Sequence, residues 1–183
     1  HSFWFCGFPE SFQREIFADR PYVLTPASLN IGAGSAQEVE GGYRLSGTWG
    51  WGTGIVHANW AMVGALMTDE NGGLAPTFFA VPRDEVDTVD TWYVAGMCGT
   101  GSLDIKIDDV CVPTERSIDM FELTNATSAS KLHDGPLYRT PLVPILGFAS
   151  ALSVLGAAQG AVEEYRERTM AKMASGVQRA GGT

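Results

Sequence analysis

The segment from Gly47 to Gly54 places two tryptophans and two threonines among four glycines. Glycine lets a backbone approach a flat ligand closely. Trp51 offers a broad apolar face for stacking, and Thr53 offers a hydrogen-bonding hydroxyl for a ring nitrogen. This composition is compatible with a site for a planar heterocycle. The alternative is a strand that ends in a glycine-rich turn and directs its tryptophans into a core.

Two further loops share this hydroxyl-rich and glycine-rich composition. The first runs from Thr25 to Ser35 and contains Ser28, and the second runs from Gly96 to Ser102. Each alone is compatible with a simple turn, but three such loops in one small β domain suggest that they converge on a ligand. Two interpretations of Ser102 stay open at this stage, contact with that ligand or capping of a strand.

The elements that must position these loops are short β-rich runs separated by glycine turns. Gly41-Gly42 predicts a hairpin turn, and a second hairpin is predicted between the runs Trp60–Met67 and Thr77–Val81. In the run 103–108, apolar and charged residues alternate, which predicts a strand with one buried and one solvated face. The fold class expected is α+β, with a central antiparallel β-barrel or sandwich.

Helices are expected on both sides of this β region. An amphipathic pattern predicts a short helix over Pro9–Phe17, and a helical pattern covers Leu142–Met173. Neither helix can bury its apolar face alone, so further helices are expected from other chain or other subunits. The predicted organisation is the end of a helical domain (1–20), a β domain (21–118), a linker (119–140) and the start of a second helical domain (141–183).

Composition argues against several functions. The chain has 21 acidic and 12 basic residues, a net charge of −9, which opposes binding to nucleic acid or to an anionic membrane surface. Its three cysteines are widely spaced and form no CxxC pair, so we expect reduced thiols, no metal and a cytoplasmic location. The stretch between Arg139 and Glu163 lacks charge, but Pro141 and Pro144 favour a buried helix over a membrane span.

Five motifs follow one another along nearly the whole chain: Phe8-Pro9-Glu10, Gly41–Gly47, Thr53-Gly54, Gly99–Ser102 and Tyr138–Pro141. Together they resemble the acyl-CoA dehydrogenase fold, in its branch of two-component flavin-dependent monooxygenases. That branch includes the oxygenase components of hydroxyphenylacetate and steroid-phenol hydroxylases. Cys98 stands where the family commonly has arginine.

The resemblance implies a β domain that holds one face and one edge of a flavin. Trp51 would lie against the ring, Thr53 near N5, and Ser28 near C4a and the substrate, with Ser102 as a further cofactor-binding residue. Reduced FMN or FAD from a separate NAD(P)H-dependent reductase would form a C4a-hydroperoxide that hydroxylates a small phenolic substrate. The resemblance also implies a homotetramer, and a catalytic acid or base beyond Thr183.

Two other functions remain open at the sequence level. One is an acyl-CoA dehydrogenase or a nitrogen- or sulfur-oxidising relative, which would need a carboxylate or a different pocket outside this segment. The other is a non-catalytic module that keeps the fold for binding or assembly. His57, the only histidine of the β domain, is expected to be structural, hydrogen-bonded under the strand that begins at Trp60, and His133 is expected to be solvated.

Overall fold

The computed structural model describes residues 2–68 and 72–180. The chain divides into two compact units, His1–Leu142 and Val143–Thr183. The first contains a single mixed sheet with short helices, so the α+β class is confirmed. The strands are β1 (Ala27–Ser28), β2 (Gly34–Val39), β3 (Gly42–Gly52), β4 (Trp60–Thr68), β5 (Leu74–Pro82), β6 (Asp87–Val89), β7 (Leu103–Pro113) and β8 (Ser117–Asp119). The α-helices are α1 (Glu10–Ile16), α2 (Met120–Thr124), α3 (Thr127–Leu132) and α4 (Leu142–Ala180), and the 3₁₀ turns used below are η1 (Ser2–Gly7), η3 (Ile55–His57) and η5 (Cys98–Thr100).

The sheet contains both predicted hairpins. Its strand order is β6-β7-β3-β2-β4-β5-β8, and β1 pairs with β4 beside this path. The β2–β3 hairpin closes where Val39 pairs with Gly42, and Gly41 adopts a φ of 82° in the turn. A β4–β5 hairpin also forms, from Thr68↔Leu74 to Trp60↔Pro82. Short-range turn chemistry therefore predicted these pairings correctly.

The prediction of an antiparallel barrel was wrong in two respects. First, β1 and β2 both run parallel to β4. The chain reverses from β2 to β3 and again from β3 to β4, and β4 then pairs with β2 instead of β3, which makes the two strands parallel. Second, the sheet is open, because among the described residues its edge strands β6 and β8 pair on one side only. Each edge strand has three residues, a length that limits exposed pairing surface.

The open sheet nevertheless curves around one core. Tyr43 of β3 and Phe79 of β5 meet edge-to-face with ring centroids 5.3 Å apart, although β2 and β4 lie between their strands in the sheet. Leu45, Trp49 and Ile105 fill the concave side and are fully buried. In β7, Ile105 and Ile107 are buried whereas Lys106 is exposed, as the alternating pattern predicted.

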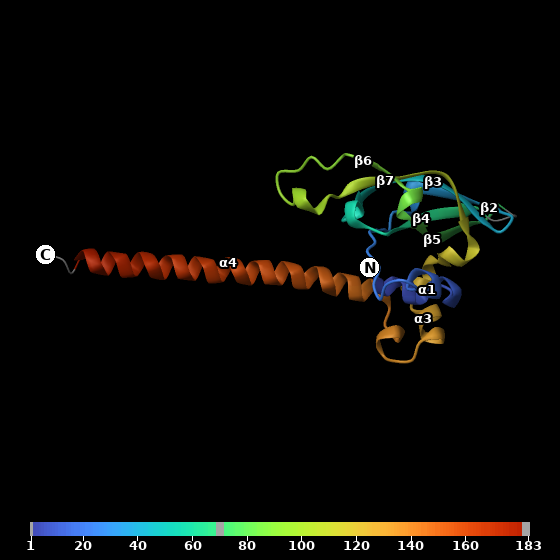
Figure 1. Cartoon of the computed structure of the whole chain (residues 1–183). Helices are drawn as coiled ribbons and strands as arrows, with labels where there is room; N and C mark the ends of the chain where they lie inside the picture. Colours follow the sequence, from blue (N-terminus) through green and yellow to red (C-terminus); the bar gives the residue numbers. More distant parts are fainter. Residues whose placement is uncertain (1, 69–71, 181–183) are drawn as a thin grey trace. The chain divides into compact units, whose positions relative to one another are not determined.

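The opposite face of β4 and β5 is covered by the N-terminal helical layer, and Figure 1 shows α1 and α3 on this side of the sheet. Trp4 of η1 meets Phe78 of β5, with 6.0 Å between centroids, and Phe12 of α1 meets Trp60 of β4 at 5.3 Å. The predicted helix over Pro9–Phe17 is confirmed as α1, which buries Phe12 and Ile16. Strands β4 and β5 are therefore covered on both faces, which explains their nearly continuous apolar sequence.

The segment expected to be a linker contains α2 and α3, two short helices that pack on η1. Helix α2 is capped by Asp119, whose carboxylate accepts hydrogen bonds from the backbone N–H groups of Phe121 and Glu122. Both helices are too short to be stable in isolation, so their contacts with the N-terminal layer hold them. The polar composition of this segment concealed that packing.

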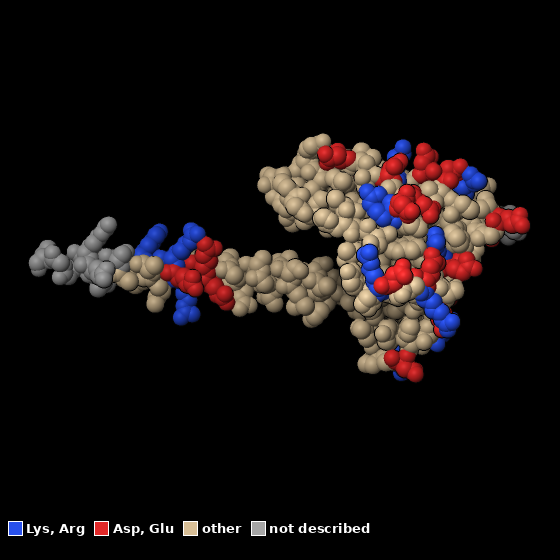
Figure 2. Space-filling model, viewed as in Figure 1, with Lys and Arg blue, Asp and Glu red and all other residues tan. Residues whose placement is uncertain are grey.

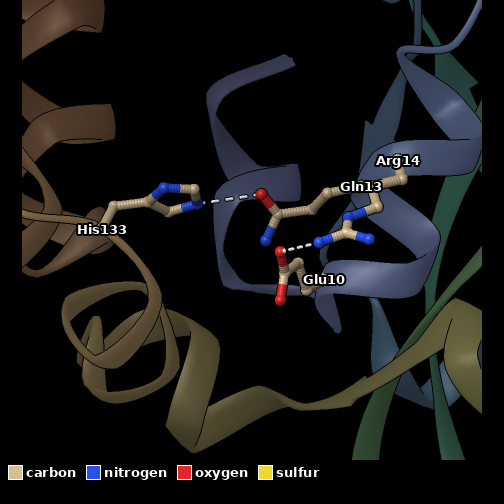
Figure 3. Close-up of polar contacts among 4 residues, drawn as sticks. All are labelled: Glu10, Gln13, Arg14 and His133. Carbon is tan, nitrogen blue, oxygen red and sulfur yellow. Dashed lines mark hydrogen bonds and ion pairs between the residues drawn. The ribbon is translucent and has the colours of Figure 1, made fainter.

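A hydrogen bond from His133 joins this segment to α1 (Figure 3). The side-chain amide of Gln13 donates to the carbonyl oxygens of Cys6 and Phe8, at 3.0 and 2.7 Å. Its Oε1 therefore accepts, and the partner Nε2 of His133, 2.8 Å away, carries the hydrogen. His133 also packs on Tyr138, with 4.8 Å between ring centroids. The expectation of a solvated His133 was wrong, because the residue is half-buried and bonded.

Helix α4 makes up nearly all of the second unit. Its first half carries no charged residue, and charges begin at Glu163, a division that Figure 2 shows along the helix. Exposed pairs at helical spacing, such as Glu164 with Arg168, lie on the charged half. The stretch Leu142–Ala174 is long enough to cross a membrane, and its most apolar 18-residue window has a mean hydropathy of 1.7. The core helix of a soluble protein meets the same criteria, so the expected soluble role of this helix stays a prediction.

Candidate functional site

The position of Trp51 is set by a β-bulge at the end of β3. Trp49 pairs with Ile105 and Gly52 pairs with Leu103, so two residues of β3 lie opposite one residue of β7. Trp51 lies in this bulge and has a φ of 63°. This left-handed conformation costs a non-glycine residue about 1–2 kcal/mol. Its side chain is 76% exposed. The bulge therefore holds a large aromatic ring out of the core.

Ser28 lies in the same cleft as Trp51. The short strand β1 pairs with β4 and brings the loop from Ala27 to Asn30 beside Gly50 and Trp51. These residues, with Leu29, line a cleft of about 440 Å³, a size typical of small-molecule sites. None of the lining residues has a titratable side chain. The cleft can therefore stack and hydrogen-bond a ligand, but proton transfer would have to come from elsewhere.

Thr53 and Ser102 meet directly, although they are far apart in the sequence. Their hydroxyl oxygens are 3.0 Å apart, and a further 2.8 Å separates the Ser102 and Thr100 hydroxyls. The Thr100 hydroxyl in turn donates to the carbonyl of Met97 at 2.9 Å. Thr53 is exposed, whereas Ser102 is only 2% exposed. We call these three residues, Thr53, Ser102 and Thr100, the hydroxyl chain.

Backbone contacts hold the two ends of this site together. The N–H of Gly54 donates to the carbonyl of Thr100 at 3.0 Å, which ties the end of β3 to η5. Arg83 supports the next turn, because its Nε donates to the carbonyl of Ile55 and its Nη1 to that of Val86. Arg83 therefore holds η3 in place through these hydrogen bonds and has a structural role.

The glycines around Trp51 have different functions from those the sequence suggested. A Cβ at Gly52 would lie 2.7 Å from the Ile105 side chain, so this glycine is required by core packing. Gly54 adopts a φ of 81° in the turn that starts η3. At Gly50 a Cβ would have only ordinary contacts, the nearest at 3.6 Å. Of these three, only Gly50 also lines the cleft.

Of the four residues predicted for the site, the structure brings Ser28 and Trp51 into one cleft, and Thr53 and Ser102 into one hydrogen bond. The two pairs are joined through the backbone, since the N–H of Thr53 donates to the carbonyl of Trp51 at 2.7 Å. Sequence reasoning did not single out Thr100, although it lies in the quoted loop. Its position two residues before Ser102 was the one feature of the sequence that could have indicated a contact between the two hydroxyls.

The histidine and cysteine side chains considered next are not part of the cleft or the hydroxyl chain. His57 is exposed on η3, so its predicted place under the Trp60 strand was wrong. Cys98 is exposed and donates to the carbonyl of Val94. Burial raises the pKa of the Cys6 thiol from 9.0 to about 11, against the opposing effect of a backbone hydrogen bond, so Cys6 stays protonated at neutral pH. Within residues 2–68 and 72–180, no group of three or more metal-ligating side chains occurs.

Two curated proteins are similar to most of this chain. The chain is 42% identical over 164 residues to a pigment production hydroxylase of Rhodococcus sp. (strain ATCC 21145), covering 88% of this chain and 42% of that protein. It is 30% identical over 179 residues to the oxygenase component of an FADH2-dependent resorcinol hydroxylase of Rhizobium sp. (strain MTP-10005), covering 96% of this chain and 44% of that protein. No family model matches the chain.

A solved structure agrees with these relatives. XiaF from Streptomyces sp., determined in complex with FADH2 and glycerol, superposes with a TM-score of 0.68 at 35% identity, over 75% of this chain and 35% of XiaF. The chain is homologous to one section of the oxygenase components of flavin-dependent monooxygenases, and its β unit has the fold of the corresponding section in their solved structures. It spans less than half the length of the curated relatives given above. The β unit, which carries the Trp51 cleft, therefore corresponds to one section of these longer relatives.

Proposed function

We propose that this chain forms one wall of the flavin site in the oxygenase component of a two-component monooxygenase. The complete protein would use reduced FMN or FAD and O₂ to hydroxylate a small aromatic or phenolic substrate. The observation that carries the proposal is the exposed ring of Trp51, held in a strained conformation in a cleft with Ser28 and next to the hydroxyl chain. Strain in the backbone of an exposed aromatic residue is expected where the residue serves a ligand.

The residues present fit a flavin. An isoalloxazine ring needs an apolar face to stack on and a few polar groups at its edge, and the cleft offers Trp51 for the first and Ser28 for the second. Thr53 lies two residues beyond Trp51, so its hydroxyl would meet the ring edge. When bound, reduced flavin supplies the electrons that activate O₂.

The role of this chain is then to bind and orient. Trp51 stacks on the ring, Thr53 fixes one edge of the ring through a hydrogen bond, and Ser28 presents a hydroxyl toward the substrate side. None of these groups can act as an acid or base near neutral pH. The proton-transferring group would therefore come from chain outside this segment, which agrees with its coverage of less than half of the relatives.

The proposal includes two partners and a location. The reduced flavin would be supplied by a separate NAD(P)H-dependent reductase, since the sequence contains no GxGxxG dinucleotide motif. The exposed apolar half of α4 needs cover, and a homotetramer would provide it through the remaining helices and subunits. We propose a cytoplasmic enzyme, in keeping with the three free thiols.

The test is turnover of the full-length protein with reduced FMN or FAD, O₂ and a panel of phenols. We expect a hydroxylated product from at least one phenol, and Thr53→Val should divert a larger share of the oxygen to hydrogen peroxide. Thr48→Val is the matched control, because Thr48 is exposed on β3 and outside both the cleft and the hydroxyl chain. Reduction of bound flavin by acyl-CoA compounds, without any phenol product, would instead support a dehydrogenase.

A further inference from the structure

The donor and acceptor of each bond in the hydroxyl chain can be inferred, because each hydroxyl has only one hydrogen to donate. The chain ends at the carbonyl oxygen of Met97, which has no hydrogen and can only accept. That oxygen also accepts from the N–H of Thr100 and from Nε1 of Trp92, at 3.0 and 3.1 Å. Its position is therefore well fixed, and it gives the chain a definite terminus.

The direction of every bond in the chain follows from this terminus. Thr100 uses its hydrogen on Met97, so it can only accept from Ser102, and Ser102 in turn can only accept from Thr53. This is the arrangement in which all three bonds form together. Ser102 is 2% exposed, so a lost bond there would leave a buried polar group unsatisfied. Burial therefore favours this one polarity over its alternatives.

Thr53 is left with acceptor capacity alone on its exposed side. The other acceptor within reach of its hydrogen is the carbonyl of Trp51, at 3.5 Å, which is longer than a normal hydroxyl hydrogen bond. Donation to either partner uses the hydrogen inside the protein. Toward a ligand in the site, Thr53 therefore presents lone pairs and no hydrogen.

We propose that Thr100 and Ser102 are positioning residues that fix Thr53 as a hydrogen-bond acceptor and thereby make the site select reduced over oxidised flavin. The inference rests on the proposed flavin site. The chemistry is that of N5, which carries a hydrogen in reduced flavin and a lone pair in oxidised flavin. An acceptor-only hydroxyl can bond the first and has no hydrogen to donate to the second.

The test compares affinities, not turnover. Dissociation constants of reduced and oxidised FMN and FAD are measured under anaerobic conditions for the full-length protein and its variants. We expect the wild-type protein to bind the reduced form more tightly. Thr53→Val should weaken binding of reduced flavin by about fivefold, the value of one hydrogen bond, and leave the oxidised form nearly unchanged.

Two variants that retain Thr53 test the polarity itself. Ser102→Ala removes the acceptor of the Thr53 hydrogen, and Thr100→Val frees the Ser102 hydrogen for Thr53. Either change lets Thr53 donate, so binding of oxidised flavin should improve by about fivefold. Both variants are made because either one alone could fail to fold, and Thr48→Val, outside the chain, should leave both constants unchanged.

The outcomes separate the inference from the proposed function. A wild-type protein that binds neither form of either flavin would overturn the proposed function, and the inference with it. A wild-type protein that binds flavin, with variants that weaken both forms equally or leave their ratio unchanged, would overturn the inference alone. A ratio that moves toward oxidised flavin in folded Ser102→Ala or Thr100→Val protein supports it, because a purely structural role would not improve any binding.

Discussion

Trp49 and Trp51 lie two residues apart in β3 and have opposite environments. Trp49 is fully buried, and its indole Nε1 donates to the carbonyl of Gly64 at 2.8 Å. Trp51 is 76% exposed beside the cleft. Residues two apart in a regular strand point to the same face, so unbroken alternation would have buried both. The bulge between them separates a core residue from an exposed, cleft-lining residue of the same type.

The comparison also distinguishes two ways in which glycine is used. Gly34 makes room for the Trp49 ring, since a Cβ there would lie 2.1 Å from it. Gly50 lies next to Trp51 and has space for a Cβ. The buried side of β3 is therefore constrained by packing, whereas the side that carries Gly50 and Trp51 faces the open cleft. Each prediction below tests one side against the other.

The largest effect is expected for Trp49→Ala. Removal of a fully buried tryptophan should destabilise the protein by about 3–5 kcal/mol, because a cavity forms and Gly64 loses its donor. Trp51→Ala is the matched control and should change stability by less than about 0.5 kcal/mol, as is usual for exposed positions. Urea unfolding of the full-length protein measures both. Equal losses in the two variants would contradict the assignment of separate roles.

Gly34→Ala should have the next largest effect. The added methyl group would overlap the Trp49 ring, and overpacking of this kind costs about 1–3 kcal/mol. Gly50→Ala should leave the unfolding midpoint unchanged and weaken flavin binding, because the new methyl group would project into the cleft. Thermal unfolding and flavin titration are the two measurements. A stable Gly34→Ala variant would mean that Trp49 can move away.

Trp51→Gly should weaken flavin binding by about tenfold, since an aromatic face worth roughly 1.5 kcal/mol beyond simple burial is lost. Stability should stay the same or rise slightly, because glycine adopts a φ of 63° without strain. Phe121→Ala, a change of an exposed aromatic residue on α2, is the control and should affect neither. Flavin affinity that survives Trp51→Gly would remove Trp51 from the site.

The smallest effect concerns the other bulge between β3 and β7. There Asp109 has a φ of 56° and forms an exposed ion pair with Arg44. Exposed pairs contribute little, so Arg44→Met should destabilise the protein by at most about 1 kcal/mol and leave flavin binding unchanged. The same unfolding and titration experiments apply. A large loss of flavin affinity would show that this bulge also shapes the cleft.

Local patterns in the sequence predicted the local elements well. The Gly41-Gly42 turn, the β4–β5 hairpin, helix α1 and the alternation in β7 all depend on contacts between near neighbours, and all are confirmed. The parallel pairing of β2 with β4 depends on which distant strand lies alongside, and no period in the sequence encodes it. For the same reason the polar segment around α2 and α3 was not recognised as packed.

For the candidate site, the sequence by itself determined which residue types were available: an aromatic residue, hydroxyl groups and glycines in three loops, in an order that resembles a flavoprotein family. Tertiary structure decided which of them meet. The bulge at Trp51 and the contact between Thr53 and Ser102 both arise from the register of β3 against β7. That register is set by the packing of a shared core, so residues far from the cleft determine what it presents.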